Sequence, residues 1–319
     1  MSTYPLRHDY VVTRVDELVN NILSPNTRIS IQQISKQLNL YYQPMTLFYN
    51  DELKYTASIE WFIGSCYLVC GKYNPSEVVW DEAMTTDFVH VLRLYQPEFA
   101  KAISDFASQE QRNSNSLYDY MSHYLNQYAR VLIVRVDLKM RQKYSNLVDV
   151  ETFNNYMNQL MIKVQRGREK EKKRKARKLA NISKDCFEDL RGYAWAVEQG
   201  VENGGLHCHL LLIYNGDKRH KDWSLGDAVG RKWIEITNGL GRYYNCNDTE
   251  HKNFYEAHGL LGIGMIHKSN ELEKDNAMRA ALYLTRPEKY EQRLKAWTPN
   301  MRTFGHGNYC KTKRRGDHP

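Results

Sequence analysis

The first third of the chain has the spacing of amphipathic helices. Its apolar residues recur three or four positions apart, as in Val12, Val15 and Val19, which places them on one face of a helix. This pattern continues from about residue 11 to residue 126, and the alternation typical of strands is hard to find there. The sequence therefore predicts an all-helical N-terminal domain over residues 1–126.

The pattern changes to strict alternation at residues 130–140 (RVLIVRVDLKM). Every second residue from Leu132 to Leu138 is aliphatic, and these side chains would form one apolar face of a strand. The other face is mixed and carries Arg135 and Asp137. We expect this strand to open a second domain over residues 127–305.

Two further strand patterns follow, at residues 193–199 (YAWAVEQ) and 206–214 (LHCHLLLIY). Both segments are short and rich in aromatic and apolar residues. The intervening Asn203-Gly204-Gly205 suits the positive-φ turn of a β-hairpin. The sequence therefore predicts two adjacent antiparallel strands.

The whole pattern is that of an α+β protein, because a purely helical part precedes a part that mixes strands and helices. The remaining periodicity predicts, in chain order, a helix over residues 150–164, a helix over 225–237, a polar loop to about residue 249, a strand over 263–267 and a helix over 275–285.

The helix expected over residues 150–164 runs on into a charged segment, residues 166–178 (RGREKEKKRKARK), where nine basic residues outnumber two acids. Such a segment is either a solvated helix extension or a stretch that contacts phosphates, and the sequence does not separate these alternatives. A second basic segment, the tail, is expected over residues 306–319. The candidate phosphate contacts in the charged segment are Arg166, Arg168, Lys172, Lys173, Arg174 and Lys175.

A metal site is predicted on the hairpin. His207 and His209 are two positions apart on a strand, so their imidazoles project from the same face. Glu198 falls opposite one or the other according to the register, and either pairing puts its carboxylate on that face too. Two imidazoles and a carboxylate suit a divalent metal, for which we expect Mn or Mg. A histidine-triad hydrolase is excluded because position 211 is Leu.

The last predicted helix carries a candidate nucleophile. Its N-cap would be Asp275 or Asn276, and Pro287 would stop it. Tyr283 is the candidate, and Tyr290 is the fallback beyond the proline.

The spacing of the helix places Arg279 and Arg286 on the same polar stripe as Tyr283. A phenol has a pKa near 10, so it needs nearby positive charge to act as a nucleophile at neutral pH. The two guanidinium groups would supply that charge. The alternative is that Tyr283 only anchors the helix to the sheet.

Composition narrows the class of protein. The chain has 45 Lys and Arg against 37 Asp and Glu, and the resulting net charge of +8 favours a polyanionic partner. Its six cysteines form no C-x-x-C pair, so we expect neither a structural zinc site nor a disulfide framework, and a cytoplasmic location fits. The sequence begins without the apolar stretch of a signal peptide, and the longest apolar run, residues 61–70, is too short to span a membrane.

These motifs resemble those of the HUH endonuclease superfamily. Residues 206–210 (LHCHL) resemble its His-hydrophobe-His motif, and residues 283–286 (YLTR) resemble its Tyr-x-x-Lys motif, with Arg286 in place of lysine. The order of strand, His-x-His strand and Tyr helix is similar to that of Rep-type initiators. Residues 193–214 and 281–290 look most like the inovirus gene-two-type replication proteins and the YagK/YfjJ C-terminal domain group.

The resemblance implies a five-stranded antiparallel sheet flanked by helices, of ferredoxin-like or RRM-like type, with a metal on its central strands. It implies a rolling-circle replication initiator of a phage, prophage or plasmid-like element. Such a protein nicks and joins single-stranded DNA, or a DNA hairpin at an origin, through a 5′-phosphotyrosine. Cys208 would point away from the metal, and Asp137 is a candidate for orienting a ligand.

Three alternatives stay open. One is a transposase or mobilisation protein with the same chemistry, another is a non-catalytic DNA-binding regulator, and the third is a zinc-dependent hydrolase that would not need Tyr283. The role of residues 1–126 is also open between recognition of duplex DNA and recruitment of a host helicase.

Overall fold

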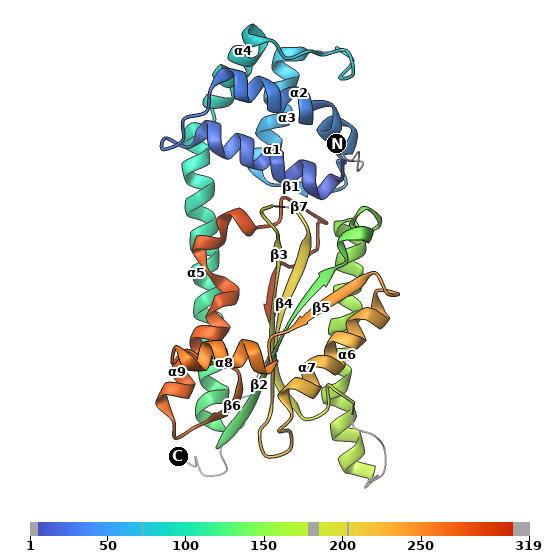
Figure 1. Cartoon of the computed structure of the whole chain (residues 1–319), viewed down its shortest axis with the longest axis vertical. Coiled ribbons are helices and arrows are strands. Elements are labelled where there is room, and N and C mark those ends of the chain that lie inside the picture. Colours follow the sequence, from blue (N-terminus) through green and yellow to red (C-terminus); the bar gives the residue numbers. More distant parts are fainter. Residues whose placement is uncertain (1–5, 72, 178–184, 203, 309–319) are drawn as a thin grey trace, which may run out of the picture.

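The structure is a computed structural model that describes residues 6–71, 73–177, 185–202 and 204–308. Figure 1 shows a group of helices at one end, a β-sheet with its own helices at the other, and one long helix beside both. The fold is α+β, with a helical N-terminal part and an antiparallel sheet flanked by helices, which confirms the predicted fold class.

The helical pattern of the N-terminal part is confirmed. Val12, Val15 and Val19 are buried in a core that the helices share. The second helix begins at a capping box, in which the side chains of Ser30 and Gln33 each accept a hydrogen bond from the other's backbone N–H. The four helices are α1 (His8–Leu23), α2 (Ile31–Phe48), α3 (Ala57–Cys70) and α4 (Glu82–Arg93).

Helix α5 (Gln96–Gln127) connects the helical part to the sheet. It runs alongside both in Figure 1, and its last turns pack into the sheet core, where Leu117, Tyr120 and Tyr124 are buried. The domain boundary expected at residue 127 falls at the end of this helix and stays a prediction.

The sheet has six strands, one more than the resemblance implied. Their order is β5-β2-β4-β3-β8, all pairs are antiparallel, and β6 pairs with the same edge of β2 as β5 does. Strand β2 is long enough to pair with β5 near its end and with β6 near its start, so the sheet is five strands wide. The strands are β2 (Arg130–Met140), β3 (Leu190–Gln199), β4 (Leu206–Asn215), β5 (Gly241–Asn245), β6 (Gly264–His267) and β8 (Phe304–His306).

The prediction of a polar loop after residue 237 is wrong, because the segment contains strand β5. The segment looked like a loop for its Gly, Asn and Asp content, yet Tyr243 and Tyr244 favour a strand and pair with β2. A Cβ at Gly241 would lie 2.5 Å from Thr237 Oγ1, so glycine is needed where this strand leaves the preceding helix. Helix α8 (Thr249–Ala257), which follows β5, was not predicted either and buries none of its residues.

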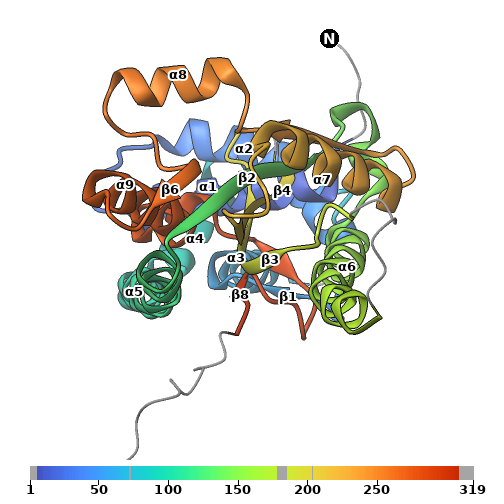
Figure 2. The same ribbon diagram turned by 90° about the horizontal axis from the view of Figure 1, so that it is seen from below.

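Helices cover both faces of the sheet (Figure 2). On one face, every second residue from Leu132 to Leu138 packs with Cys208 beneath α6 (Val150–Arg177) and α7 (Asp222–Ile236). On the opposite face, Ile133 packs with α5 and α9 (Glu271–Leu282). The one apolar and one mixed face predicted for β2 are thus confirmed, and Cys208 points away from the mixed face.

Helix α9 begins earlier than expected. Asn270 is its N-cap and accepts a hydrogen bond from the backbone N–H of Glu273, so the assignment of Asp275 or Asn276 as the cap is wrong. Asn276 is instead buried and donates to the carbonyl of Gly259. Past Leu282 the chain tightens into two 3-10 helices, η2 (Tyr283–Thr285) and η3 (Pro287–Gln292), and another 3-10 helix, η1 (Gln142–Leu147), follows β2.

The helical part and the sheet part meet in a buried polar contact. Asp16 of α1 lies 2.7 Å from an Nη of Arg293, which follows η3, and also accepts from Ser58. Only 3% of the Asp16 side chain and 11% of the Arg293 side chain are exposed. Nearby, the two-residue strand β1 (Lys54–Tyr55) pairs with β7 (Ala296–Trp297).

Helix α1 also contacts the tip of the β3–β4 hairpin. The side-chain amide of Gln199 donates hydrogen bonds to the carbonyl of Asp9 and to Thr13 Oγ1, and each donor–acceptor distance is 3.1 Å. Gly204 has φ +66°, and a Cβ there would lie 2.3 Å from the Asp9 carbonyl oxygen. The close approach of α1 therefore requires glycine in the hairpin turn.

In the described part of the chain, each helix is too short or too polar to cross a bilayer. The cysteines found in that part, at positions 66, 70, 186, 208 and 246, are all free.

We predict that Asp16→Ala lowers the free energy of unfolding by about 3–5 kcal/mol, because it leaves the Arg293 charge buried without its partner. The matched control is Glu235→Ala, which breaks an exposed pair with Lys232 and should cost about 1 kcal/mol or less. Urea unfolding of the two variants measures the difference. Equal losses would contradict a structural role for the buried pair.

Candidate metal centre

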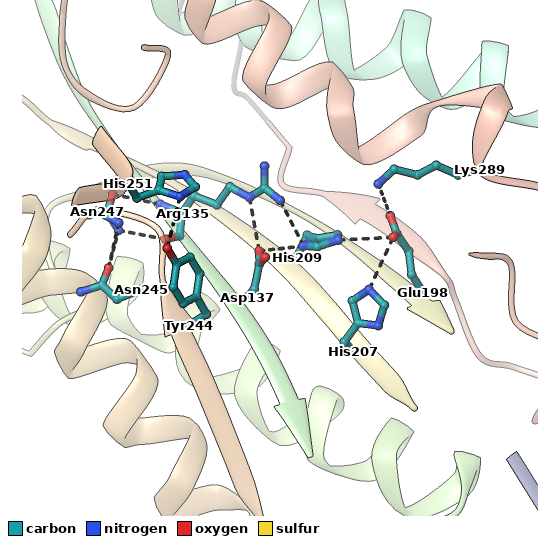
Figure 3. A network of polar contacts seen from close by, with 10 residues as sticks. All are labelled: Arg135, Asp137, Glu198, His207, His209, Tyr244, Asn245, Asn247, His251 and Lys289. Carbon is teal, nitrogen blue, oxygen red and sulfur yellow. Dashed lines mark hydrogen bonds and ion pairs between the residues drawn. The ribbon is translucent and has the colours of Figure 1, made fainter. Parts of the chain in front are cut away.

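The hairpin register fixes how the predicted ligands face one another. Glu198 of β3 pairs directly with His207 of β4, and Asp137 of β2 pairs with His209. Strand periodicity then places all four side chains on one face of the sheet. Figure 3 shows them converging between β2, β4 and β3.

Glu198, His207 and His209 come close enough to share one cation. Glu198 Oε2 lies 3.3 Å from His209 Nε2 and 3.5 Å from His207 Nε2. One ligand atom from each residue lies within 4.8 Å of the others, and Glu198 and His209 are buried. The spacing suits a divalent ion, since ligands about 2.1 Å from such an ion lie about 3 Å apart when they meet at a right angle.

The other nitrogen of each imidazole is held by a hydrogen-bond acceptor. His209 Nδ1 lies 2.7 Å from Asp137 Oδ1, and His207 Nδ1 lies 3.3 Å from the carbonyl oxygen of Gly205. With a metal ion bound, these acceptors would keep the ring proton on Nδ1 and leave the Nε2 lone pair of each imidazole to bind the ion. Arg135 Nη2 also lies 3.2 Å from His209 Nδ1. Asp137 thus lies where the sequence suggested that it would orient a ligand.

This arrangement calls for a positive charge at its centre. Two imidazole lone pairs and a carboxylate oxygen are all electron-rich, so they repel one another unless a proton or a metal ion lies between them. The residues present therefore fit a divalent metal.

The titration of the site follows from its burial and its partners. Burial acts to raise the pKa of Glu198, but hydrogen bonds from His207 and His209 hold that pKa well below its usual range. The pKa of Asp137 is likewise lowered, by His209 and Arg135, against the effect of burial. Burial acts to lower the pKa of His209, yet Asp137 and Glu198 raise it. These shifts favour ionised carboxylates, and they favour the protonated form of His209 when no metal ion is bound.

Two cations complete the site, and neither was among the predicted site residues. Lys289 of η3 is buried, and its Nζ lies 2.6 Å from Glu198 Oε1. Arg135 Nε lies 3.3 Å from Asp137, and Asn247 hydrogen-bonds both backbone polar groups of Arg135 (Figure 3). Arg135 could have been found from its place beside Asp137 on the mixed face, whereas nothing in the local sequence marks Lys289.

Tyr283 lies against His209, one of the predicted ligands. Its ring meets that of His209 edge to face, with the centroids 5.8 Å apart. Lys289 Nζ lies 3.6 Å from the Tyr283 ring centroid, and the guanidinium carbons of Arg135 and Arg286 lie 4.9 and 5.0 Å from it. Burial, aided by the charge of Glu198, raises the pKa of Tyr283, while Arg135 opposes that rise.

The charge around Tyr283 therefore differs from the prediction. Arg286 is there as expected, but Arg279 is exposed on α9 and is not among the cations found at the ring in the described structure. The α-helix ends at Leu282, and the chain continues from Tyr283 as the 3-10 helix η2.

Tyr290, the fallback nucleophile, lies in a different environment. The guanidinium carbon of Arg293 is 3.7 Å from its ring centroid, and Phe106 of α5 meets it edge to face. Among the described contacts, none joins Tyr290 to the three predicted ligands. The geometry thus favours Tyr283 over Tyr290 as the residue next to a bound metal.

The charged segment lies away from this centre. Helix α6 covers the opposite face of the sheet from α5 and α9 (Figure 2), and Arg166 is exposed on it. Of the other candidate phosphate contacts, Arg168, Lys172, Lys173, Arg174 and Lys175, the side chains lie outside the described residues, as does most of the expected basic tail.

A comparison with protein families gives one match. The family model described as the YagK/YfjJ C-terminal domain matches residues 100–307. The matched region starts in α5 and contains every strand of the six-stranded sheet, all the predicted ligands and Tyr283. No curated protein and no solved structure matches the chain.

We predict that Asp137→Ala weakens Mn²⁺ binding about 10- to 100-fold, because His209 then loses the acceptor that fixes its Nδ1 proton and its ring orientation. Isothermal titration of the purified protein with Mn²⁺ measures the affinity. Asp217→Ala is the matched control, since Asp217 is an exposed aspartate paired only with Arg130 in the described structure, and it should bind Mn²⁺ as the wild type does. A similar affinity in both variants would count against the assigned role of Asp137.

Proposed function

The chain belongs to the YagK/YfjJ C-terminal domain family, and from this premise we propose that it is a rolling-circle replication initiator of a phage, prophage or plasmid-like element. It would nick and rejoin single-stranded DNA through a 5′-phosphotyrosine. The observation that carries the proposal is the contact of Tyr283 with His209, which puts a candidate nucleophile beside a candidate metal centre.

Glu198, His207 and His209 would hold a divalent ion, Mn or Mg, in this function. When bound, such an ion supplies Lewis-acid polarisation of a phosphate oxygen and neutralises part of its charge. The identity of the metal is open. Asp137 and the Gly205 carbonyl would keep the two imidazoles turned toward the ion.

The chain's own residues then carry the transfer. Tyr283 Oη loses its proton to solvent and forms a bond to the phosphorus, while the bond from phosphorus to the 3′ oxygen breaks. The departing 3′ oxygen takes up a proton and leaves as a 3′-hydroxyl. Attack by a 3′-hydroxyl on the phosphotyrosine reverses the step and rejoins a strand, so no external energy source is needed.

The cations around Tyr283 favour this step. Lys289, Arg135 and Arg286 all lie within 5.0 Å of the ring centroid, where they stabilise a phenolate and the charge of an incoming phosphate. The charge of Glu198 is one cause of the raised pKa of Tyr283. Pairing Glu198 with a metal cation would remove that cause.

Arg286 and Lys289 also bear on the Tyr-x-x-Lys motif, in which this chain departs from the superfamily pattern. Arg286 stands where a lysine is usual, and it keeps the charge but is a poor proton donor. Lys289 places an ammonium group closer to the Tyr283 ring than Arg286 does. We assign to Lys289 the proton-donating role that the motif lysine would have toward the departing 3′ oxygen.

The partner would be single-stranded DNA or a DNA hairpin at an origin. Contacts of the charged segment, residues 166–178, with the strand outside the catalytic centre would make binding weaken steeply with salt. A host helicase is a further partner that the helical part could recruit.

A transposase or mobilisation protein would use the same chemistry on a different DNA site. A non-catalytic regulator would bind DNA without cutting it, and the close grouping of Glu198, His207, His209 and Tyr283 argues against it, because a scaffold does not need those side chains together.

We predict that the wild-type protein, incubated with labelled single-stranded DNA and Mn²⁺ or Mg²⁺, forms a covalent adduct on Tyr283. Tyr283→Phe should lower adduct formation at least about a thousand-fold. Tyr290→Phe, the matched control, should keep it. Mass spectrometry of the digested adduct locates the modified residue.

The other outcomes separate the alternatives. An adduct that persists in Tyr283→Phe and maps to Tyr290 would overturn the choice of nucleophile. Cleavage without any adduct would support a hydrolase, and binding without cleavage would support a regulator.

A further inference from the structure

A cavity of about 530 Å³ opens beside the candidate metal centre. One wall comes from α5 and from residues 55–57, where β1 leads into α3. The other comes from β3, η3 and the segment that leads into β8. Figure 1 shows α5 running beside β3 with the chain of η3 between them. Glu198 lies in the lining, so the cavity begins where the group of metal ligands ends.

The lining combines cations, aromatic rings and amides with two carboxylates, Glu110 and Glu198, and with several aliphatic side chains. The cations Arg286 and Lys289, which also surround Tyr283, lie at the end near Glu198, and Arg302 is an exposed cation elsewhere in the lining. Aromatic rings are contributed by both walls. They are Tyr55, Phe106, Tyr290, Trp297 and Phe304.

Amide side chains supply hydrogen-bonding groups in the same lining. On α5, the side-chain Nε2 of Gln109 donates a hydrogen bond of 3.1 Å to Asn113 Oδ1. The partly buried Gln292 of η3 makes no side-chain hydrogen bond within the described residues. Its amide therefore has both a donor and an acceptor to offer to a ligand.

We propose that this cavity binds one unpaired base of the DNA strand, next to the phosphate that Tyr283 attacks. The inference rests on the proposed function, and it adds a base-recognition site to it. The volume is within the range of about 300–1,000 Å³ that small-ligand pockets have. A nucleotide whose phosphate lies at Glu198 and Arg286 has its own base within reach of the cavity.

The chemistry of the lining suits a nucleobase better than a purely apolar or a purely anionic ligand. Aromatic rings stack on bases of any sequence. Amide groups such as that of Gln292 can read the edge of a base that has been turned out of a strand. Cations near the entrance suit the phosphates on either side of that base.

The extent of the family match agrees with this site. The match begins at residue 100 and so includes the part of α5 that forms the wall, from Ala102 to Asn113, while it leaves out α1 to α4. Most of the lining thus lies within the matched region, and Tyr55, Thr56 and Ala57 lie outside it.

Photocrosslinking tests the proposal on the full-length protein. The probe is a single-stranded oligonucleotide of thymidine in which 5-iodouracil replaces thymine, and mass spectrometry locates the crosslinked residues. We expect crosslinks to Phe106, Tyr290 or Phe304. Crosslinks found only outside the cavity would overturn the proposal.

Two pairs of variants test the cavity by affinity. Phe106→Ala removes a ring from the lining, and Ala102→Phe fills the space, so each should raise the Kd for the oligonucleotide about 5- to 150-fold, the effect of one lost stacked base. The matched controls on the same helix, Tyr118→Ala and Ser104→Phe, lie outside the lining and should leave the Kd unchanged. Equal effects in variants and controls would contradict the proposal, and thermal unfolding checks that each variant is folded.

The same samples separate this inference from the proposed function. Crosslinks in the cavity without an adduct on Tyr283 would keep the base site and overturn the nicking activity. An adduct on Tyr283 without crosslinks in the cavity, and with a normal Kd for Phe106→Ala, would keep the nicking activity and overturn the base site.

Discussion

The structure around the site depends on how the negative charge of one buried carboxylate, that of Glu198, is paired. Glu198 is ionised, although only 6% of the residue is exposed. One of its carboxylate oxygens faces two imidazole nitrogens, and the other accepts a hydrogen bond from the ammonium group of Lys289. A buried charge is costly unless it is paired and hydrogen-bonded. The surrounding elements supply that pairing, because β4 brings His207 and His209, η3 brings Lys289, and the remaining gap between the lone pairs fits a divalent ion.

Segments far from the hairpin hold this arrangement in place. Helix α1 contacts the hairpin tip through Gln199, and Asp16 binds Arg293 at the end of η3, the 3-10 helix that carries Lys289. Helix α1 therefore contacts the two segments that carry Glu198 and Lys289, although none of α1 to α4 contributes a predicted ligand. These contacts give the helical part a structural reason to be joined to the sheet.

The sequence was informative where the physics is local. Alternation in residues 130–140 predicted β2 and its two faces, and the two-residue spacing of His207 and His209 with the tight turn predicted the common face of the ligands. It failed where distant segments decide. Strand β5 is stabilised by pairing with β2, and Lys289 reaches Glu198 only because η3 folds back over β3, so neither shows a periodic signal of its own. The walls of the cavity include α5 and η3, which are far apart in the chain, so no local sequence motif predicts the cavity.

We infer that Glu198, His207 and His209 meet around a cation. An anomalous difference map from a crystal of the protein grown with Mn²⁺, recorded at the manganese absorption edge, would locate that ion. We expect one strong peak within bonding distance of Glu198 Oε2 and the Nε2 atoms of both histidines, with Asp137 still hydrogen-bonded to His209. A map with no peak there, and with the three side chains joined only by protons, would contradict it.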